Sequence, residues 1–233
     1  MKALNVLLFD GFTTMDALGP AEALSRALEG ERKCYEIEYF SATGELVGSS
    51  TSAKIWTRKL DEMAKFDLLL VPGGFAVREL AHEGEFIAIL GELARRHEYV
   101  ITACTGSVLL AKTGLLDGME ATSNKLSWQW ATSEAPGVRW VRAARWCVSG
   151  KFYTGSGVSA GIDAALGFIA DMHGRNEAQR ITLARWNMSK VATKTRSCFK
   201  IYGDLHWFDW LIFKVRRLVV AVAVKFARGK LVF

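Results

Sequence analysis

Short apolar runs alternate with amphipathic stretches along most of the chain. The runs have the length and the aliphatic or β-branched composition of strands in an α/β protein. We expect strands at Asn5–Phe9, Tyr35–Ser41, Phe66–Val71 and Tyr99–Ala103. Apolar residues at helical spacing predict helices at Asp16–Leu28, Glu85–Arg96, Ser107–Thr113, Ser159–His173 and 176–187. The short runs Arg145–Ser149 and Lys151–Thr154 predict a hairpin around Gly150.

The alternation of strands and helices implies a mostly parallel sheet covered by helices on both faces. Sites in such sheets form at the carboxyl ends of the strands. Unusual residues follow three of the predicted strands: Asp10-Gly11 leading to Asp16, Pro72-Gly73-Gly74, and Cys104-Thr105-Gly106. We therefore expect the functional site at this edge of the sheet.

The charge of the chain is unevenly distributed. Residues 1–184 hold 19 Lys and Arg against 22 Asp and Glu, whereas residues 185–233 hold 11 against 2. The overall net charge of +6 therefore belongs to the C-terminal segment. The main domain has no basic footprint for nucleic acid, and we expect no nucleic-acid partner.

The cysteines and the start of the chain indicate a cellular location. Cys34, Cys104, Cys147 and Cys198 are far apart, so their spacing matches neither a zinc knuckle nor a CxxC redox pair. The first apolar run lacks a small-residue cleavage site, and no stretch reaches the roughly 18 uninterrupted apolar residues of a transmembrane helix. We expect reduced thiols and a cytoplasmic location.

Cys104 is the strongest candidate for a reactive residue. It lies between a predicted strand and a predicted helix, at the kind of elbow that presents nucleophiles in other α/β enzymes. The start of a helix favours a thiolate. The competing interpretation is a small buried hydrophobe, which is the usual state of a free cysteine.

The other two strand ends have similar pairs of interpretations. Gly73 and Gly74 form either an ordinary tight turn or an oxyanion pocket made of backbone N–H groups. Asp16 either caps a helix or reaches the thiol as a general acid or base. No histidine abuts Cys104 in sequence, and His82, eight positions after the glycine turn, is the one that we consider able to approach the site.

Five segments, in this order and spacing, resemble the ThiJ/PfpI superfamily, a branch of the class I glutamine amidotransferase-like fold. They are Phe9–Pro20, Val71–Gly74, Ala103–Ser107, Gly114–Lys125 and Thr154–Asp163. The resemblance implies a flavodoxin-like three-layer α/β sandwich, with a mostly parallel sheet and a cysteine nucleophile elbow, over residues 1–187. We also expect a homodimer that acts on a small-molecule substrate.

The residue after the cysteine distinguishes branches of this superfamily. Protease-like members carry a histidine there, and Thr105 removes that base. The Cys-Thr-Gly-Ser elbow with an aspartate in the first loop is similar to isonitrile hydratase and its relatives. The resemblance implies a hydro-lyase that adds water to an isonitrile through a covalent thioimidate and needs neither a cofactor nor a metal. It implies Cys104 as the nucleophile, Asp16 as the acid and base, and oxyanion or substrate-binding roles for Gly73, Gly74, Thr105 and Asn124.

One departure from that branch concerns Asn124. Isonitrile hydratase and many relatives that are fused to transcription factors carry a histidine at this position. Asparagine forms hydrogen bonds but cannot shuttle a proton near neutral pH. Two alternatives therefore stay open: a glyoxalase-like or deglycase-like activity on reactive carbonyls, and a non-catalytic redox-sensing or ligand-sensing module.

Residues 188–233 form a basic, hydrophobic C-terminal extension outside the family pattern. The extension is interpreted as packing on the domain or on a partner subunit, as a poorly ordered segment, or as a membrane-surface segment. The hydrophobic pattern has no clean helical period, so we favour the first two interpretations over membrane contact.

Overall fold

The computed structural model describes residues 1–186, and an eight-stranded sheet is their central layer. The strand order is β11-β12-β8-β7-β1-β4-β6-β5. Neighbours from β12 to β6 are parallel, and the two outermost pairs, β11–β12 and β5–β6, are antiparallel. The strands are β1 (Lys2–Leu7), β4 (Tyr35–Ser41), β5 (Glu45–Gly48), β6 (Lys54–Lys59), β7 (Leu68–Val71), β8 (Tyr99–Ala103), β11 (Trp146–Ser149) and β12 (Phe152–Gly155).

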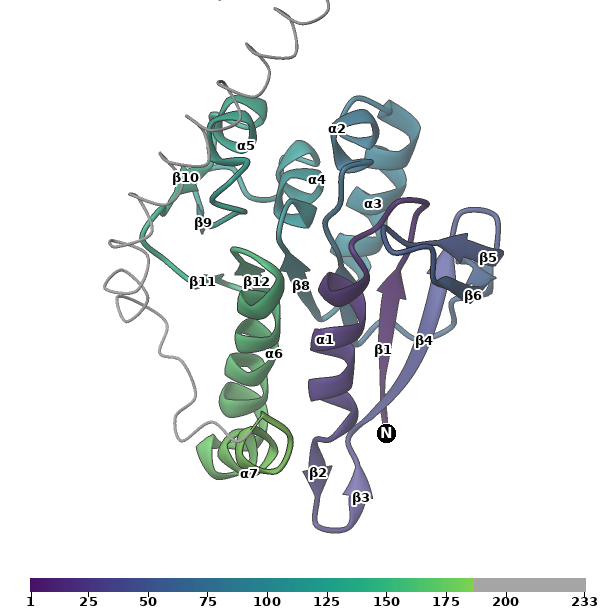
Figure 1. Ribbon diagram of the computed structural model, residues 1–233, viewed down its shortest axis with the longest axis vertical. Coiled ribbons are helices and arrows are strands. Elements are labelled where there is room, and N and C mark those ends of the chain that lie inside the picture. Colours follow the sequence, from purple (N-terminus) through teal and green to yellow (C-terminus); the bar gives the residue numbers. More distant parts are fainter. Residues whose placement is uncertain (187–233) are drawn as a thin grey trace, which may run out of the picture. The chain divides into compact units, whose positions relative to one another are not determined.

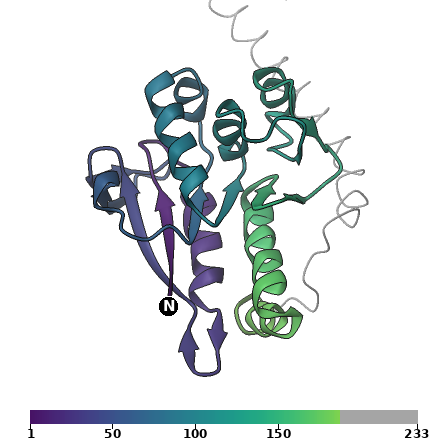
Figure 2. The same cartoon turned by 180° about the vertical axis from the view of Figure 1, so that it is seen from behind.

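Helices cover both faces of this sheet, which confirms the predicted α/β fold. The helices α1 and α6 lie side by side on one face, and α3 lies on the other (Figures 1 and 2). The helices are α1 (Thr14–Ser25), α2 (Val77–Leu80), α3 (Gly84–Arg96), α4 (Gly106–Lys112), α5 (Trp128–Glu134), α6 (Val158–His173) and α7 (Arg175–Trp186). The remaining elements are two short strand pairs, β2 (Leu28–Glu29) with β3 (Arg32–Lys33) and β9 (Glu120–Ala121) with β10 (Arg139–Trp140), and the 3₁₀ turn η1 (Leu60–Glu62).

The central strands are apolar on both sides because both sides are covered. All four residues of β7 are buried, and β8 is buried from Val100 to Ala103. Continuous apolar runs of this kind are typical of parallel strands between two helical layers. The sequence pattern therefore predicted β8 and β4 with the bounds that the structure has.

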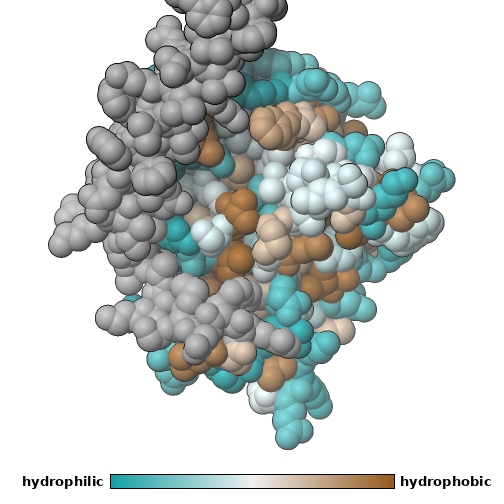
Figure 3. Space-filling model, in the orientation of Figure 1, coloured by the Kyte–Doolittle hydropathy of each residue, from teal (hydrophilic) through white to brown (hydrophobic). Residues whose placement is uncertain are grey.

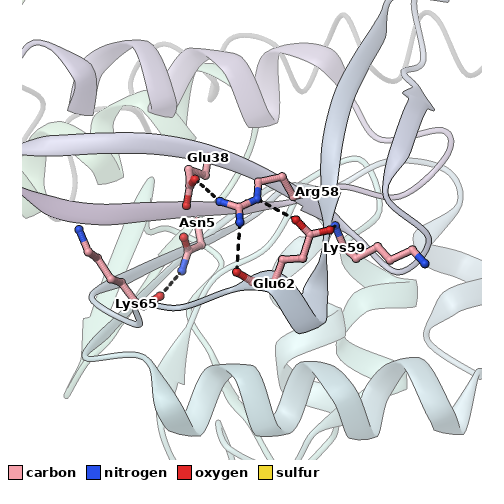
Figure 4. Close-up of polar contacts among 6 residues, drawn as sticks. All are labelled: Asn5, Glu38, Arg58, Lys59, Glu62 and Lys65. Carbon is pink, nitrogen blue, oxygen red and sulfur yellow. Dashed lines mark hydrogen bonds and ion pairs between the residues drawn. The ribbon is translucent and has the colours of Figure 1, made fainter.

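The sequence pattern missed the outer hairpin β5–β6. Its strands carry exposed charged residues such as Lys54 and Arg58, which hide the alternation of an edge strand. Arg58 joins β6 to its neighbours by donating to Glu38 of β4 at 2.6 Å and to Glu62 at 3.1 Å (Figure 4). In the same view, Asn5 of β1 donates to the Lys65 carbonyl at 2.7 Å. The ion pairs are largely exposed and contribute little to stability.

The predicted helices and the C-terminal hairpin form with small shifts at their ends. The first strand lies earlier than predicted, at Lys2–Leu7, because Lys2 at its exposed start pairs in register with Tyr35 of β4. None of the described helices has the length and apolarity needed to span a membrane. The extension predicted for 188–233 lies outside the described residues.

The helix α6 approaches β8 closely at Gly161. A Cβ atom on this residue would lie 2.8 Å from the Cβ atom of Ala103, which directly precedes Cys104. We expect Gly161→Ala to lower the free energy of unfolding by about 1–3 kcal/mol, because the helix must move away from the strand. Urea denaturation measures this change. Gly84→Ala is the matched control, since Gly84 starts α3 with open space around it, and equal losses in both variants would contradict the packing argument.

Candidate active site

Cys104 lies on a strained turn between β8 and α4. Its φ of +56° is in the left-handed region, which residues with a side chain rarely adopt. The backbone is held on both sides: Cys104 N–H donates to Gly155 O at 2.9 Å, and the Ser107 and Ser123 hydroxyls donate to Cys104 O at 3.0 and 3.2 Å. This is the geometry of a nucleophile elbow.

Two glycines allow the loops after β7 and β8 to touch. A Cβ atom on Gly73 would lie 2.6 Å from Thr105 N and 2.8 Å from Cys104 Cβ. A Cβ atom on Gly106 would lie 2.4 Å from Val71 O. No side chain larger than hydrogen fits at either position, so the glycines set the closeness of the two strand ends.

Asp16 is completely buried in the first turn of α1. Burial raises the pKa of its carboxyl to about 6, while the Cys104 thiol and the Gly73 backbone N–H act in the opposite direction. Neither carboxyl oxygen completes a hydrogen bond of good geometry with the described residues. The structure therefore places next to the thiol a buried carboxyl group whose capacity for hydrogen bonds is not filled.

Asn124 lies in the loop between β9 and α5 and contacts the sulfur directly. Its Nδ2 donates to Cys104 Sγ at 3.0 Å. Its Oδ1 accepts from the backbone N–H groups of Leu126 at 2.8 Å and Ser127 at 3.3 Å. These two bonds determine the orientation of the amide, because a flipped amide would place N–H against N–H.

The thiolate expected at a helix start is not the resting form of Cys104. Burial raises the pKa of the thiol to about 12, and the negative charge of Asp16 acts in the same direction. The Asn124 amide and the Thr105 backbone N–H lower this pKa but do not outweigh the other two effects. At neutral pH the site therefore holds a protonated thiol and a mostly ionised carboxylate.

Thr105 also lies at the site, where its hydroxyl group forms hydrogen bonds with the backbone of Gly74. Gly74 N–H donates to Thr105 Oγ1 at 3.1 Å, and this hydroxyl donates to Gly74 O at 3.3 Å. Gly73 N–H faces the Asp16 carboxyl. Both glycine N–H groups therefore already have neighbours, and their service as oxyanion donors stays a prediction.

The histidines within residues 1–186 form their contacts with groups other than the Cys104 sulfur. His82 pairs with Glu134 at 3.6 Å. His97 is buried between Asn5 Nδ2 and Leu93 O, and His173 contacts Tyr35 and Cys34. The residues that sequence reasoning missed at the site are Ser123 and Lys125, whose roles depend on a loop fold that local patterns do not reveal.

Other features of the described residues are separate from this site. A hollow of about 400 Å³ lies beside α1, where Figure 3 shows apolar residues gathered across the face, and neither Cys104 nor Asp16 lines it. Within residues 1–186, no group of three or more His, Cys, Asp and Glu side chains is arranged to hold a metal ion.

The fold and the site define an α/β protein with a cysteine on a strand-to-helix elbow and a buried acid beside it. A sequence model of the DJ-1/PfpI family matches residues 1–171, so the chain belongs to the DJ-1/PfpI family. This confirms the resemblance found in the sequence.

The proteins that this chain resembles in sequence have different names and functions. Isonitrile hydratase of Pseudomonas putida is 27% identical over 185 residues, which cover 77% of this chain and 76% of that protein. The HTH-type transcriptional regulator GbdR of Pseudomonas aeruginosa is 28% identical over 188 residues, which cover 78% of this chain but only 49% of the regulator.

Solved structures share the same fold. A ThiJ/PfpI family protein from Pseudomonas syringae has a TM-score of 0.68 at 25% identity, covering 78% of this chain and 74% of that one. Drosophila melanogaster DJ-1beta also has a TM-score of 0.68, at 22% identity, covering 82% and 99% of the two chains. The second likeness shows the fold alone.

The pKa values of the site predict how Cys104 reacts with iodoacetamide. Because only the thiolate reacts, we expect the alkylation rate of wild type to rise about tenfold per pH unit from pH 7 to 10 without a plateau. Asp16→Asn removes the neighbouring charge, lowers the pKa of the thiol and raises the rate at pH 8 by about tenfold. Peptide mass spectrometry separates Cys104 from the other cysteines.

Asp10→Asn is the matched control for this experiment. Asp10 lies in the loop between β1 and α1, is exposed and accepts a hydrogen bond from Gly48 N–H at 2.8 Å. Its replacement should leave the Cys104 rate unchanged. A wild-type plateau below pH 9, or a slower rate in Asp16→Asn, would contradict this account of the thiol.

Proposed function

We propose that this protein is a cysteine-dependent enzyme that adds water to an isonitrile and releases an N-substituted formamide. The supporting observation is the buried pair of a Cys104 thiol and an Asp16 carboxyl with a pKa of about 6. A carboxyl that titrates near neutral pH can serve as base and acid in one cycle. Similarity to the isonitrile hydratase of Pseudomonas putida favours this substrate class.

In the first step, the Asp16 carboxylate accepts the thiol proton while Cys104 Sγ attacks the terminal carbon of the isonitrile. A carbon–sulfur bond forms, and Asp16 then delivers the proton to the same carbon. The product is a thioimidate, in which the nitrogen–carbon triple bond has become a double bond. Asn124 Nδ2, at 3.0 Å from the sulfur, stabilises the negative charge that develops there during proton transfer.

In the second step, water adds to the thioimidate carbon. Asp16 accepts a proton from this water and passes it to the imidate nitrogen, which gives a tetrahedral adduct. The carbon–sulfur bond then breaks as the adduct hydroxyl becomes the formamide carbonyl, and Asp16 accepts the hydroxyl proton and returns it to the sulfur. Isonitrile and water are consumed in equal amounts, and the enzyme returns to its starting state.

Formamide release from an alkyl isonitrile tests this proposal, with gas chromatography or NMR as the measurement. We expect turnover in wild type and none above background in Cys104→Ala, because the nucleophile is gone. Asp16→Asn should also lose turnover, even though its thiol alkylates faster, because it has no base. For wild type, kcat/KM should fall about tenfold per pH unit below pH 6, where the Asp16 carboxylate becomes protonated.

Two other outcomes would favour the alternative functions. Loss of methylglyoxal that depends on Cys104 would favour action on reactive carbonyls. The observation behind the sensing alternative is the similarity to HTH-type transcriptional regulators, of whose length this chain spans about half. Selective peroxide oxidation of Cys104 without turnover of either substrate would support that alternative.

The expected homodimer stays a prediction that sedimentation velocity can measure.

A further inference from the structure

The side chain of Lys125 turns back toward the loop that carries Asn124. Its ammonium group donates to Thr122 Oγ1 and to Ser123 O, the latter at 3.2 Å. It also lies 4.6 Å from the centre of the Trp128 ring, within the range of a cation–π contact. Three separate groups therefore hold this one charge.

The peptide that Lys125 holds is the one that precedes Asn124. Ser123 O belongs to the peptide bond whose nitrogen is that of Asn124, so a bond to this oxygen limits rotation of the whole peptide plane. On its other side, Ser123 Oγ donates to Cys104 O at 3.2 Å. Asn124 Nδ2 then reaches Cys104 Sγ. The Lys125 ammonium group thus restrains the peptide unit that joins Ser123 to Asn124, the two residues whose side chains contact Cys104.

The loop is anchored at its other end through Thr122. The Thr122 hydroxyl accepts from Lys125 and donates to Val141 O, at 3.0 Å, or to Ala144 O, at 3.2 Å. Thr122 N–H donates to Thr154 Oγ1 of β12 at 3.0 Å. Hydrogen bonds therefore link Thr154 of β12 to Thr122, and Thr122 to the Lys125 ammonium group. The same ammonium group binds the carbonyl that precedes Asn124, whose amide donates to Cys104 Sγ.

Loss of the ammonium group would remove a hydrogen-bond donor from Thr122 Oγ1 and from Ser123 O. Thr122 and Ser123 are both fully buried, so the loop would shift to satisfy them. Burial and the positive charge of Arg142 lower the pKa of Lys125 to about 8, and Cys147 acts in the opposite direction. The charged form therefore still predominates at neutral pH.

We propose that Lys125 is a positioning residue for the nucleophile: its ammonium group holds the 122–125 loop so that the Asn124 amide donates to the Cys104 sulfur. The proposal rests on Cys104 as the reactive group of the proposed function. It does not depend on which substrate the sulfur attacks. Lys125 acts through Asn124 and does not itself belong among the catalytic residues.

A double-mutant cycle on the alkylation of Cys104 by iodoacetamide tests this proposal. The variants are Lys125→Met, Asn124→Ala and the two combined, and peptide mass spectrometry gives the rate at pH 7, where the Lys125 ammonium group is mostly charged. We expect each single variant to react about five to ten times more slowly than wild type, because the thiolate loses a charge-assisted hydrogen bond. The combined variant should be no slower than Asn124→Ala alone, because both changes remove the same contact. Factors that multiply in the combined variant would overturn the proposal.

Lys151→Met is the matched control for the loss of a partly buried lysine. Lys151 donates to Arg95 O at 3.0 Å and to His97 O at 2.8 Å, at the other end of β12 and β8. This variant should lower the melting temperature and leave the Cys104 rate unchanged. An equal slowing in Lys151→Met would assign the effect to general loosening and would overturn the proposal.

Lys125→Arg provides the second arm, and it keeps the test valid where Lys125→Met does not fold. It retains a positive charge and N–H donors that can reach Thr122 Oγ1 and Ser123 O, so we expect it to keep at least half of the wild-type alkylation rate. A rate as low as that of Asn124→Ala would count against the proposal. Isonitrile turnover is measured in parallel: its absence in wild type overturns the proposed function, while the alkylation cycle still decides the role of Lys125.

Discussion

The close contact between the loops that follow β7 and β8 is the constraint on which the site depends. Backbone packs against backbone there, since Cβ atoms on Gly73 and Gly106 would lie 2.4–2.6 Å from main-chain atoms of the opposite loop. This contact leaves Cys104 on a turn too tight for ordinary backbone angles. Two strong backbone anchors on the cysteine, Gly155 O and the Ser107 hydroxyl, stabilise the strained conformation.

At this site, only one of the two neighbouring groups, the Cys104 thiol and the Asp16 carboxyl, is ionised at neutral pH. Both groups are buried, so two charges side by side would lack the solvation that water gives. The carboxyl loses its proton first and the thiol keeps its own, although Asn124 donates to the sulfur. Such a pair titrates as a unit, and a substrate that accepts electrons from the sulfur would draw the proton to the carboxylate.

The relatives that this chain resembles include an isonitrile hydratase and HTH-type transcriptional regulators. This chain places an asparagine at the sulfur and follows it with a half-buried lysine, Lys125. Asparagine does not carry the proton-transfer chemistry of a histidine at neutral pH, and the Lys125 ammonium group donates to Thr122 Oγ1 and Ser123 O. The acid and base work would then fall to Asp16, which makes the burial of that carboxyl central to any reaction of the sulfur.

The sequence by itself determined the architecture and the place of the site. Continuous apolar runs predicted the central strands, and the residues after them placed Asp16, Gly73 and Cys104 at one edge, because parallel strands bring their carboxyl ends together. It did not reveal the edge hairpin β5–β6, whose exposed charges mask its alternation.

Only the tertiary structure decided the protonation state of the site and the contacts of its loops. A helix start near Cys104 predicts a thiolate, but the burial that raises the pKa of the thiol comes from segments far apart in the chain. The same holds for the Asn124 contact, which needs the 122–127 loop to fold over the elbow. Desolvation and hydrogen-bond geometry depend on distances in space, and local sequence patterns do not contain those distances.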